Sequence, residues 1–321
     1  MAAAPLTATA PLVATKDAPI PDGARAFWFQ GAGGVTLRAA VAPALGPSRG
    51  SVILSPGRTE PLEKYFETIA ELQQRGFCVL IHDWRGQGLS QRMLDDRLKG
   101  HADGHGAFLD DFRILLDGME AELPRPWIAF GHSMGGALTA LALAAGETRF
   151  AAAFLTAPMM GVAAVRQLPQ AAHLIAQTMG GMGHAGDYIL KDGHDPMLGP
   201  YEKNVLTHDK RRYERYRDQL KACPDLALGG VTWGWLAFAL DCAVRLARPS
   251  AAKKADLPLT VVGASEDHLV LNGPARKYAE RAPQGRYAEI AGAFHEVLME
   301  TDPRRALVWR EFDELAARAI P

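Results

Sequence analysis

The pentapeptide Gly-His-Ser-Met-Gly at positions 131–135 constrains the fold of this chain more than any other segment. An apolar run at 127–130 precedes it, and a run of small, helix-forming residues begins at Ser133. The pattern G-x-S-x-G between a strand and a helix places its serine on a strained turn, with the hydroxyl projecting from the edge of a sheet. Glycines two residues to either side let neighbouring backbone pass without a clash. The segment therefore predicts an α/β protein with a nucleophilic serine at Ser133.

The same region contains an uncharged run of twenty residues, 127–146, which reaches the length of a membrane-spanning helix. Glycines and polar residues in its centre instead indicate a strand, a turn and a helix in series. Lys and Arg number 35 against 36 Asp and Glu, so the net charge of −1 argues against a nucleic-acid partner. The three cysteines are far apart and form no disulfide or zinc pattern, which favours a reducing compartment.

Short apolar runs alternate with longer amphipathic runs along most of the chain. Two strand-like runs between residues 24 and 41 flank a glycine-rich turn, which predicts an antiparallel edge hairpin. Further strands are expected at 51–54, 78–81, 127–130, 257–262 and 286–290, with helices near 62–75 and 107–122, from 133, after 262 and over 302–319. This alternation predicts right-handed crossovers and a mostly parallel sheet.

The alternation stops near Pro158 and resumes at Leu257, and the composition between them is mainly helical. We therefore expect an α/β core over 23–157 and 251–321 with an insertion over 158–250. Residues 1–22 are rich in Ala and Pro and lack the basic start of a secretory signal, so we expect a disordered tail and a cytoplasmic protein.

A serine nucleophile needs a histidine to take its proton and an acid to orient that histidine, in the chain order Ser, acid, His. Asp267 follows one predicted strand and His295 follows the next, so both should reach the sheet edge that carries Ser133. Glu266 is an alternative acid and His268 an alternative base. Their order and loop positions favour Asp267 and His295.

Two backbone N–H groups are expected to hold the oxyanion that forms during acyl transfer. One belongs to Met134, directly after the serine. We assign the other to Arg58, which follows Ser-Pro-Gly at 55–57, where the glycine permits a close approach of the backbone. The Arg58 side chain then either covers the entrance, meets a polar headgroup or is an ordinary surface arginine.

Two other patterns suggest ligands but do not predict them. His101, Asp103 and His105 have the spacing of a helical metal pair, yet the surrounding glycines indicate a solvated loop. Residues 181–186 match G-x-G-x-x-G but follow a helix-like segment instead of a strand. We therefore expect no metal and no cofactor.

Several motifs resemble those of α/β-hydrolases of the bacterial lysophospholipase and monoacylglycerol lipase type. They are Ser-Pro-Gly-Arg-Thr-Glu at 55–60 with Lys64 and Tyr65, Asp-Trp-Arg-Gly-Gln-Gly-Leu-Ser at 83–90, Asn-Val-Leu-Thr-His at 204–208, Gly-Gly-Val-Thr at 229–232 before Trp235, and Gly-Ala-Phe-His-Glu-Val-Leu at 292–298. The resemblance covers residue 25 to the end of the chain.

The resemblance implies an α/β-hydrolase fold with an eight-stranded, mostly parallel sheet and a helical cap inserted after the sixth strand. It implies Ser133, Asp267 and His295 as the triad, with the Arg58 and Met134 amides as oxyanion donors. Many monoacylglycerol lipases have a histidine where this chain has Pro56. The bacterial lysophospholipase branch therefore looks closer.

Apolar residues of the insertion suggest a long acyl group as part of the substrate. Trp233, Trp235, Phe238 and Met159 are candidate substrate contacts, although such residues at helical spacing are more often core. Residues 202–221 hold seven Lys or Arg and four Asp or Glu, a net of +3. A solvated helix is the favoured interpretation there, and peripheral contact of the cap with the inner membrane stays open.

The sequence thus predicts a cofactor-independent serine hydrolase of the carboxylic ester class that cleaves single-chain lipid esters, namely lysophospholipids or monoacylglycerols. The alternatives are a short-chain esterase or a peptide or amide hydrolase on the same triad, and a lipid-binding module without activity.

Overall fold

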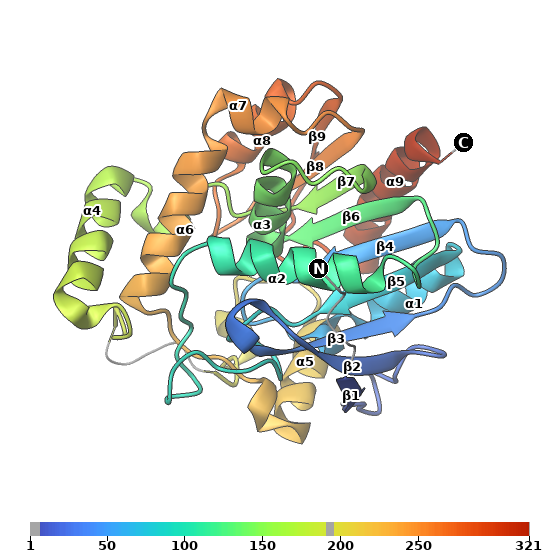
Figure 1. The fold of residues 1–321 in the computed structure, drawn as a ribbon, viewed down its shortest axis with the longest axis horizontal. Coiled ribbons are helices and arrows are strands. Elements are labelled where there is room, and N and C mark those ends of the chain that lie inside the picture. The colour runs from blue at the N-terminus through green and yellow to red at the C-terminus, as the bar shows by residue number, and fades with distance from the viewer. Residues whose placement is uncertain (1–6, 191–195, 321) are drawn as a thin grey trace.

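The computed structural model describes residues 7–190 and 196–320, in which nine strands form one sheet in the order β1-β2-β3-β5-β4-β6-β7-β8-β9 (Figure 1). The strands are β1 Thr7–Ala10, β2 Arg25–Gln30, β3 Thr36–Ala42, β4 Gly50–Ser55, β5 Phe77–His82, β6 Trp127–His132, β7 Phe150–Thr156, β8 Leu259–Ala264 and β9 Gly285–Ile290. Pairing is antiparallel from β1 to β3 and between β3 and β5, and it is parallel from β5 through β9.

The central strands are buried on both faces, which explains their continuous apolar sequences. Along β4, Val52 and Leu54 pack on one face of the sheet and Ile53 packs on the other. This alternation follows from the two-residue period of a strand. Both layers of helices therefore bury apolar surface against the same strands.

Helices cover both faces of the sheet (Figure 1). They are α1 Phe66–Gln74, α2 Gly106–Met119, α3 Ser133–Ala144, α4 Pro169–Met179, α5 Lys210–Ala222, α6 Trp233–Leu246, α7 Pro249–Lys253, α8 Asn272–Arg281 and α9 Asp302–Ala319. Short helical turns occupy Ala32–Gly34, Leu62–Tyr65, Ala163–Val165, Gly180–His184, Tyr201–Lys203 and Pro224–Leu226. Helices α1 and α9 pack on one face, while α2, α3, α7 and α8 pack on the other.

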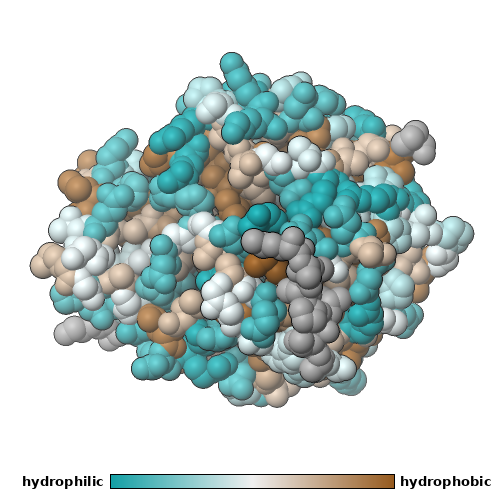
Figure 2. All heavy atoms as spheres, in the orientation of Figure 1, coloured by the Kyte–Doolittle hydropathy of each residue, from teal (hydrophilic) through white to brown (hydrophobic). Residues whose placement is uncertain are grey.

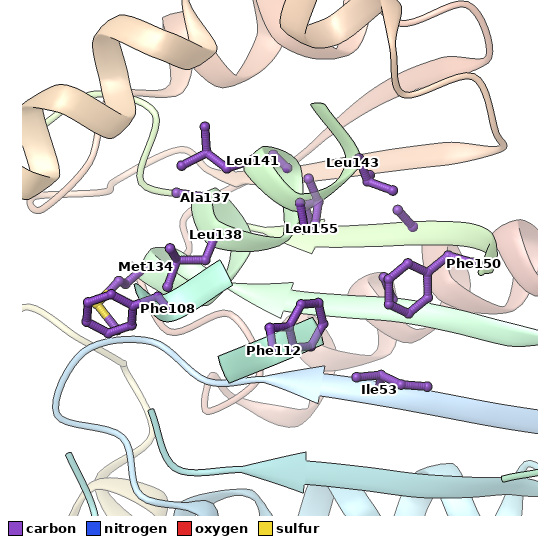
Figure 3. Packing of buried hydrophobic residues seen from close by; sticks show 14 of the residues in the cluster. Ile53, Phe108, Phe112, Met134, Ala137, Leu138, Leu141, Leu143, Phe150 and Leu155 are labelled. Carbon is purple, nitrogen blue, oxygen red and sulfur yellow. The ribbon is translucent and has the colours of Figure 1, made fainter. Parts of the chain in front are cut away.

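The second face holds the core beneath the start of α3. Figure 3 shows Phe108 of α2 beside Met134 at the start of α3, and Phe112 above Ile53 of β4. These side chains are at most 2% exposed. The turn at Ser133 is therefore supported by a close-packed core rather than by solvent-exposed loops.

The prediction of an α/β-hydrolase sheet is confirmed, with one correction at its edge. Residues 7–10 form β1, which pairs with β2, and Thr15 and Ala18 form a further bridge. The expected disordered tail over 1–22 is therefore wrong for residues 7–22, and residues 1–6 lie outside the described residues. The addition of β1 turns the expected eight strands into nine.

The insertion between β7 and β8 carries α4, α5 and α6. Helices α4 and α6 pack against each other at the far end of the molecule, and α5 lies apart from them and contacts the turn Leu62–Tyr65 (Figure 1). Figure 2 shows hydrophobic atoms on the outer end that carries α4. Among the helices of residues 7–190 and 196–320, none combines the length and apolarity that a bilayer crossing needs.

Helix α5 corrects part of a second expectation: Lys210 and Arg211 are exposed, as expected of a solvated charged helix, but two other arginines are buried. Arg212 and Arg215 are 3% and 6% exposed, and both bind the carboxylate of Glu67 on α1. Arg212 also contacts Asp209 and Asp302 at 2.6 Å each. Charges on one helix are thus neutralised by acids from distant segments, which the local sequence does not show.

Candidate active site

The turn at Ser133 joins β6 to α3 in a strained conformation. Ser133 has a φ of 50°, in the left-handed region that side chains other than glycine rarely adopt. A Cβ atom on Gly135 would lie 2.1 Å from the carbonyl oxygen of Ser55, so only glycine fits at that position. The sequence folds this way because the glycine lets the loop after β4 pass close to the serine.

Ser133, His295 and Asp267 form one hydrogen-bonded chain, although they come from loops after three different strands. His295 Nε2 lies 2.9 Å from Ser133 Oγ, and His295 Nδ1 lies 2.7 Å from Asp267 Oδ2. The other Asp267 oxygen accepts hydrogen bonds from the Leu269 and Val270 backbone at 2.8 and 2.9 Å. The acid is therefore fixed before it orients the histidine.

The environment prepares His295 to act as a base. Burial lowers its pKa, but the Asp267 carboxylate outweighs burial and leaves the pKa above its ordinary value. For Asp267, burial raises the pKa and the His295 ring more than offsets that effect, so the pKa is lowered. The pair thus holds a carboxylate next to a histidine of increased basicity.

The alternative residues stand elsewhere. Glu266 is exposed, and His268 is exposed and lines the cavity, with its ring 5.4 Å from that of Phe294. His132 is buried, which lowers its pKa to about 4, and its Nδ1 pairs with Thr156 at 3.0 Å. The structure therefore brings together Asp267 and His295, and none of these three residues lies in the hydrogen-bonded chain.

The loop after β4 runs beside the serine. A Cβ atom on Gly57 would lie 3.1 Å from Ser133 Cβ. Among the described residues, no acceptor lies within hydrogen-bonding distance of the Arg58 backbone N–H. The Met134 N–H belongs to the first turn of α3, where backbone donors lack partners within the helix. Both predicted oxyanion donors therefore remain available to a ligand.

A buried charged network lies beneath this loop, and sequence reasoning missed it. Glu60 accepts hydrogen bonds from the Gly57 N–H and the Tyr65 hydroxyl, each at 2.6 Å. Lys64 bridges Glu60, at 2.8 Å, to Glu296, the residue after His295. Burial raises the pKa of Glu60, but Lys64 and His132 outweigh it and lower the pKa to about 2. The spacing of Glu60, Lys64 and Tyr65 in the matched motif was the available signal.

The serine opens on a cavity of about 860 Å³ with mostly apolar walls. Its described lining includes Arg58, Ser133, Met159, Val162, Val165, Ile189, Leu190, Leu198, Lys203, Val205, Leu206, Trp235, Leu236, His268, Leu269 and His295. Of the four residues expected to contact substrate, Met159 and Trp235 line this cavity. Trp233 and Phe238 do not: Phe238 stacks on Phe108 at 5.1 Å in the core, and Trp233 packs against the α4–α6 cluster.

The two sequence patterns that suggested ligands, at residues 101–105 and 181–186, have structural roles. His101 is 8% exposed while the Asp103 side chain is 75% exposed, so the loop is only partly solvated. His101 Nδ1 pairs with Thr232 at 2.9 Å and its Nε2 with Asp103 at 2.8 Å. No group of three or more potential metal ligands occurs in the part of the chain that the structure describes. The turn at Gly180–His184 follows α4 and not a strand.

Comparison with known proteins places this geometry in a family. The family described as serine aminopeptidase, S33, matches residues 46–302. Lysophospholipase L2 of Escherichia coli K12 is 31% identical over 266 residues, which cover 80% of this chain and 77% of that protein. Monoglyceride lipase of Rattus norvegicus is 24% identical over 255 residues, 78% of this chain and 76% of that protein.

A solved structure shares the fold. It is a soluble variant of monoglyceride lipase from Saccharomyces cerevisiae in complex with a substrate analog, with a TM-score of 0.74 and 19% identity. The match covers 97% of this chain and 100% of the other.

Proposed function

The chain belongs to the serine aminopeptidase S33 family of α/β-hydrolases and is of its lysophospholipase and monoglyceride lipase type, and from that premise we propose that it cleaves the carboxylic ester of a single-chain lipid. The substrate is a lysophospholipid or a monoacylglycerol. The relatives that support this proposal carry these activities in their names.

One observation carries the proposal. The hydrogen-bonded chain from Asp267 through His295 to Ser133 opens on a large and mostly apolar cavity. A polar site built for a short or charged acyl group would not need apolar walls from both the core and the insertion. Ligand pockets of this size with few polar groups suit a long hydrocarbon chain.

The reaction proceeds through an acyl-enzyme. His295 takes the Ser133 proton as the serine attacks the ester carbonyl, and the amides of Arg58 and Met134 hold the oxyanion. The tetrahedral intermediate then collapses, the ester C–O bond breaks, and His295 gives its proton to the leaving alcohol. Water cleaves the acyl-enzyme by the same route, which releases the fatty acid and restores the serine.

Peptide hydrolysis is the alternative that the family description suggests. An aminopeptidase needs an acidic group to bind the ammonium of its substrate. Among the described lining residues the only carboxylates are Glu60 and Glu296, and both bind Lys64. The described cavity wall therefore favours an ester over an amino-terminal amide.

The proposal includes docking of the insertion on a lipid surface. Five apolar side chains on and beside α4 are between 52% and 74% exposed: Leu168, Leu174, Ile175, Met182 and Leu190. Leu190 also lines the cavity, so the exposed apolar surface continues into the site. A bilayer or micelle is the occupant that matches this continuity, because a substrate can pass from it into the cavity without crossing water.

A fluorophosphonate probe tests the proposed nucleophile. We expect the probe to label the wild-type protein and not Ser133→Ala, with lipid ester turnover lost in parallel. Labelling of both proteins would contradict the assignment of Ser133.

A further inference from the structure

The side chain of Arg58 is a cation that the proposed reaction does not use. Its backbone amide is the proposed oxyanion donor, and Arg58 is among the residues that line the cavity. One Nη donates to the carbonyl of Gly229, and the guanidinium carbon lies 5.4 Å from the centre of the Trp235 ring. The Nε atom is buried and has no hydrogen-bond acceptor among the described residues. The guanidinium is thus incompletely satisfied beside the reaction centre.

Other buried cations near the site have acidic partners. Arg38 contacts Glu63 at 2.7 Å and Asp83 at 2.6 Å, and Lys64 contacts Glu60 and Glu296. Arg58, by contrast, forms no ion pair with any described residue. An unpaired charge away from water is costly unless something compensates it.

Arg58 stays charged despite its surroundings. Burial lowers its pKa to about 10, which still leaves the guanidinium protonated at neutral pH. A second cation, Lys203, is exposed and lines the same cavity. The polar part of the site therefore has the charge and the planar donors that suit a phosphate oxyanion.

We propose that the guanidinium of Arg58 binds the phosphate of the substrate's leaving group, so that the site prefers a lysophospholipid to a monoacylglycerol. This inference rests on the proposed function, because it assigns a residue that binds the headgroup of the ester whose cleavage is proposed. The Arg58 amide holds the oxyanion while its side chain holds a phosphate only a glycerol backbone away from the ester. The acyl chain fills the apolar remainder of the cavity.

The test compares matched substrates in the wild type and three variants. Oleoyl lysophosphatidylethanolamine, monooleoylglycerol and p-nitrophenyl butyrate are given to the wild type, Arg58→Gln and Arg58→Lys. Arg92→Gln is the matched control, since Arg92 also has a pKa lowered to about 10 by burial and also joins the core to carbonyls of the insertion, at Asp225 and Ala227. Arg92 is not among the residues that line the cavity.

We expect the ratio of kcat/KM for the lysophospholipid to that for the monoacylglycerol to fall at least tenfold in Arg58→Gln, about 1.4 kcal/mol. Arg58→Lys should retain part of the preference, and Arg92→Gln should leave the ratio within about twofold. An equal loss of kcat/KM for both lipids would overturn the proposal, because it would show that Arg58 only holds the insertion against the core.

Inorganic phosphate separates the two sources of the anion. One result would indicate a site for free phosphate and overturn headgroup binding: phosphate inhibits butyrate ester hydrolysis in the wild type but not in Arg58→Gln, and the ratio of kcat/KM for the two lipids is the same in both proteins. Failure of the proposed function has a different signature: the wild type would cleave the butyrate ester and neither lipid. Efficient cleavage of the monoacylglycerol alone would leave the proposed function standing and reject this inference.

Discussion

The Oε2 oxygen of Glu60 lies 2.6 Å from the backbone nitrogen of Gly57. This hydrogen bond fixes the loop that carries the Arg58 amide. Because Lys64 joins Glu60 to Glu296, the same carboxylate is linked to the residue after His295. The oxyanion loop and the histidine loop are thus held by one buried network.

Replacement of Glu60 by Gln should impair catalysis more than binding. The amide oxygen of Gln can still accept from Gly57, but the amide nitrogen then faces the Lys64 ammonium and the ion pair is lost. The loop is therefore held less firmly while the cavity keeps its shape. We expect kcat for p-nitrophenyl butyrate to fall about tenfold to 100-fold with KM changed less than threefold. Glu289→Gln, at an exposed position on β9, serves as the control. An unchanged kcat in Glu60→Gln would show that the network does not position the loop.

The pH dependence should report His295. Only the neutral ring can accept the serine proton, so activity is lost as the pH falls through the pKa of His295. Asp267 raises that pKa above the ordinary value of 6.5 against the opposing effect of burial. The acid limb of kcat/KM for a short ester should therefore lie above pH 6.5. A limb below that value would contradict the pairing of the two residues.

Asp267→Asn should shift that limb to lower pH and lower the plateau by roughly 10,000-fold, since an amide favours the wrong tautomer of the histidine. The matched control is Glu266→Gln, because Glu266 is the adjacent acid and is exposed. The control should keep wild-type activity and pH dependence. If Glu266→Gln lost activity and Asp267→Asn did not, the acid that orients His295 would be Glu266 and not Asp267.

Arg212 should contribute strongly to stability. Its side chain is 2% exposed and holds Glu67, Asp209 and Asp302. Arg212→Met leaves these carboxylates without that partner and should lower the free energy of unfolding by about 2 to 3 kcal/mol. This value is smaller than the usual cost of breaking a buried ion pair because Asp302 is exposed. Urea denaturation measures the change. Arg211→Met, at an adjacent side chain that is 63% exposed, should change it by less than about 0.5 kcal/mol.

The exposed face of α4 should bind lipid surfaces. Leu174→Ser removes a 65% exposed apolar side chain from this face and should weaken sedimentation with phospholipid vesicles by about tenfold. Leu45→Ser changes a 45% exposed leucine in the loop between β3 and β4, away from the insertion, and should leave binding unchanged. Equal effects of the two changes would remove the case for docking through α4.

Much of the core was predictable because its signals are local. The apolar run at 127–130, the glycines around Ser133 and the loops after β8 and β9 each encode their role within a few residues. Parallel strands then bring their carboxyl ends to one edge, so Asp267 and His295 could be matched to Ser133 without knowledge of the fold's details.

The features that were missed depend on partners far away in the chain. Strand β1 looks like an Ala-rich and Pro-rich tail until β2 supplies its hydrogen bonds. Arg212 and Arg215 of α5 look solvated until Glu67 is placed against them. Likewise, helical spacing did not distinguish Trp235, which lines the cavity, from Phe238, which packs on Phe108.

Release of fatty acid reports directly on cleavage of single-chain lipid esters by Ser133. Lysophospholipids, monoacylglycerols and p-nitrophenyl esters of increasing chain length should be assayed side by side with the wild type and Ser133→Ala. We expect the wild type to cleave long-chain single-chain lipids faster than short esters, and Ser133→Ala to cleave none of them. A preference for short esters, or turnover that survives in Ser133→Ala, would contradict this expectation.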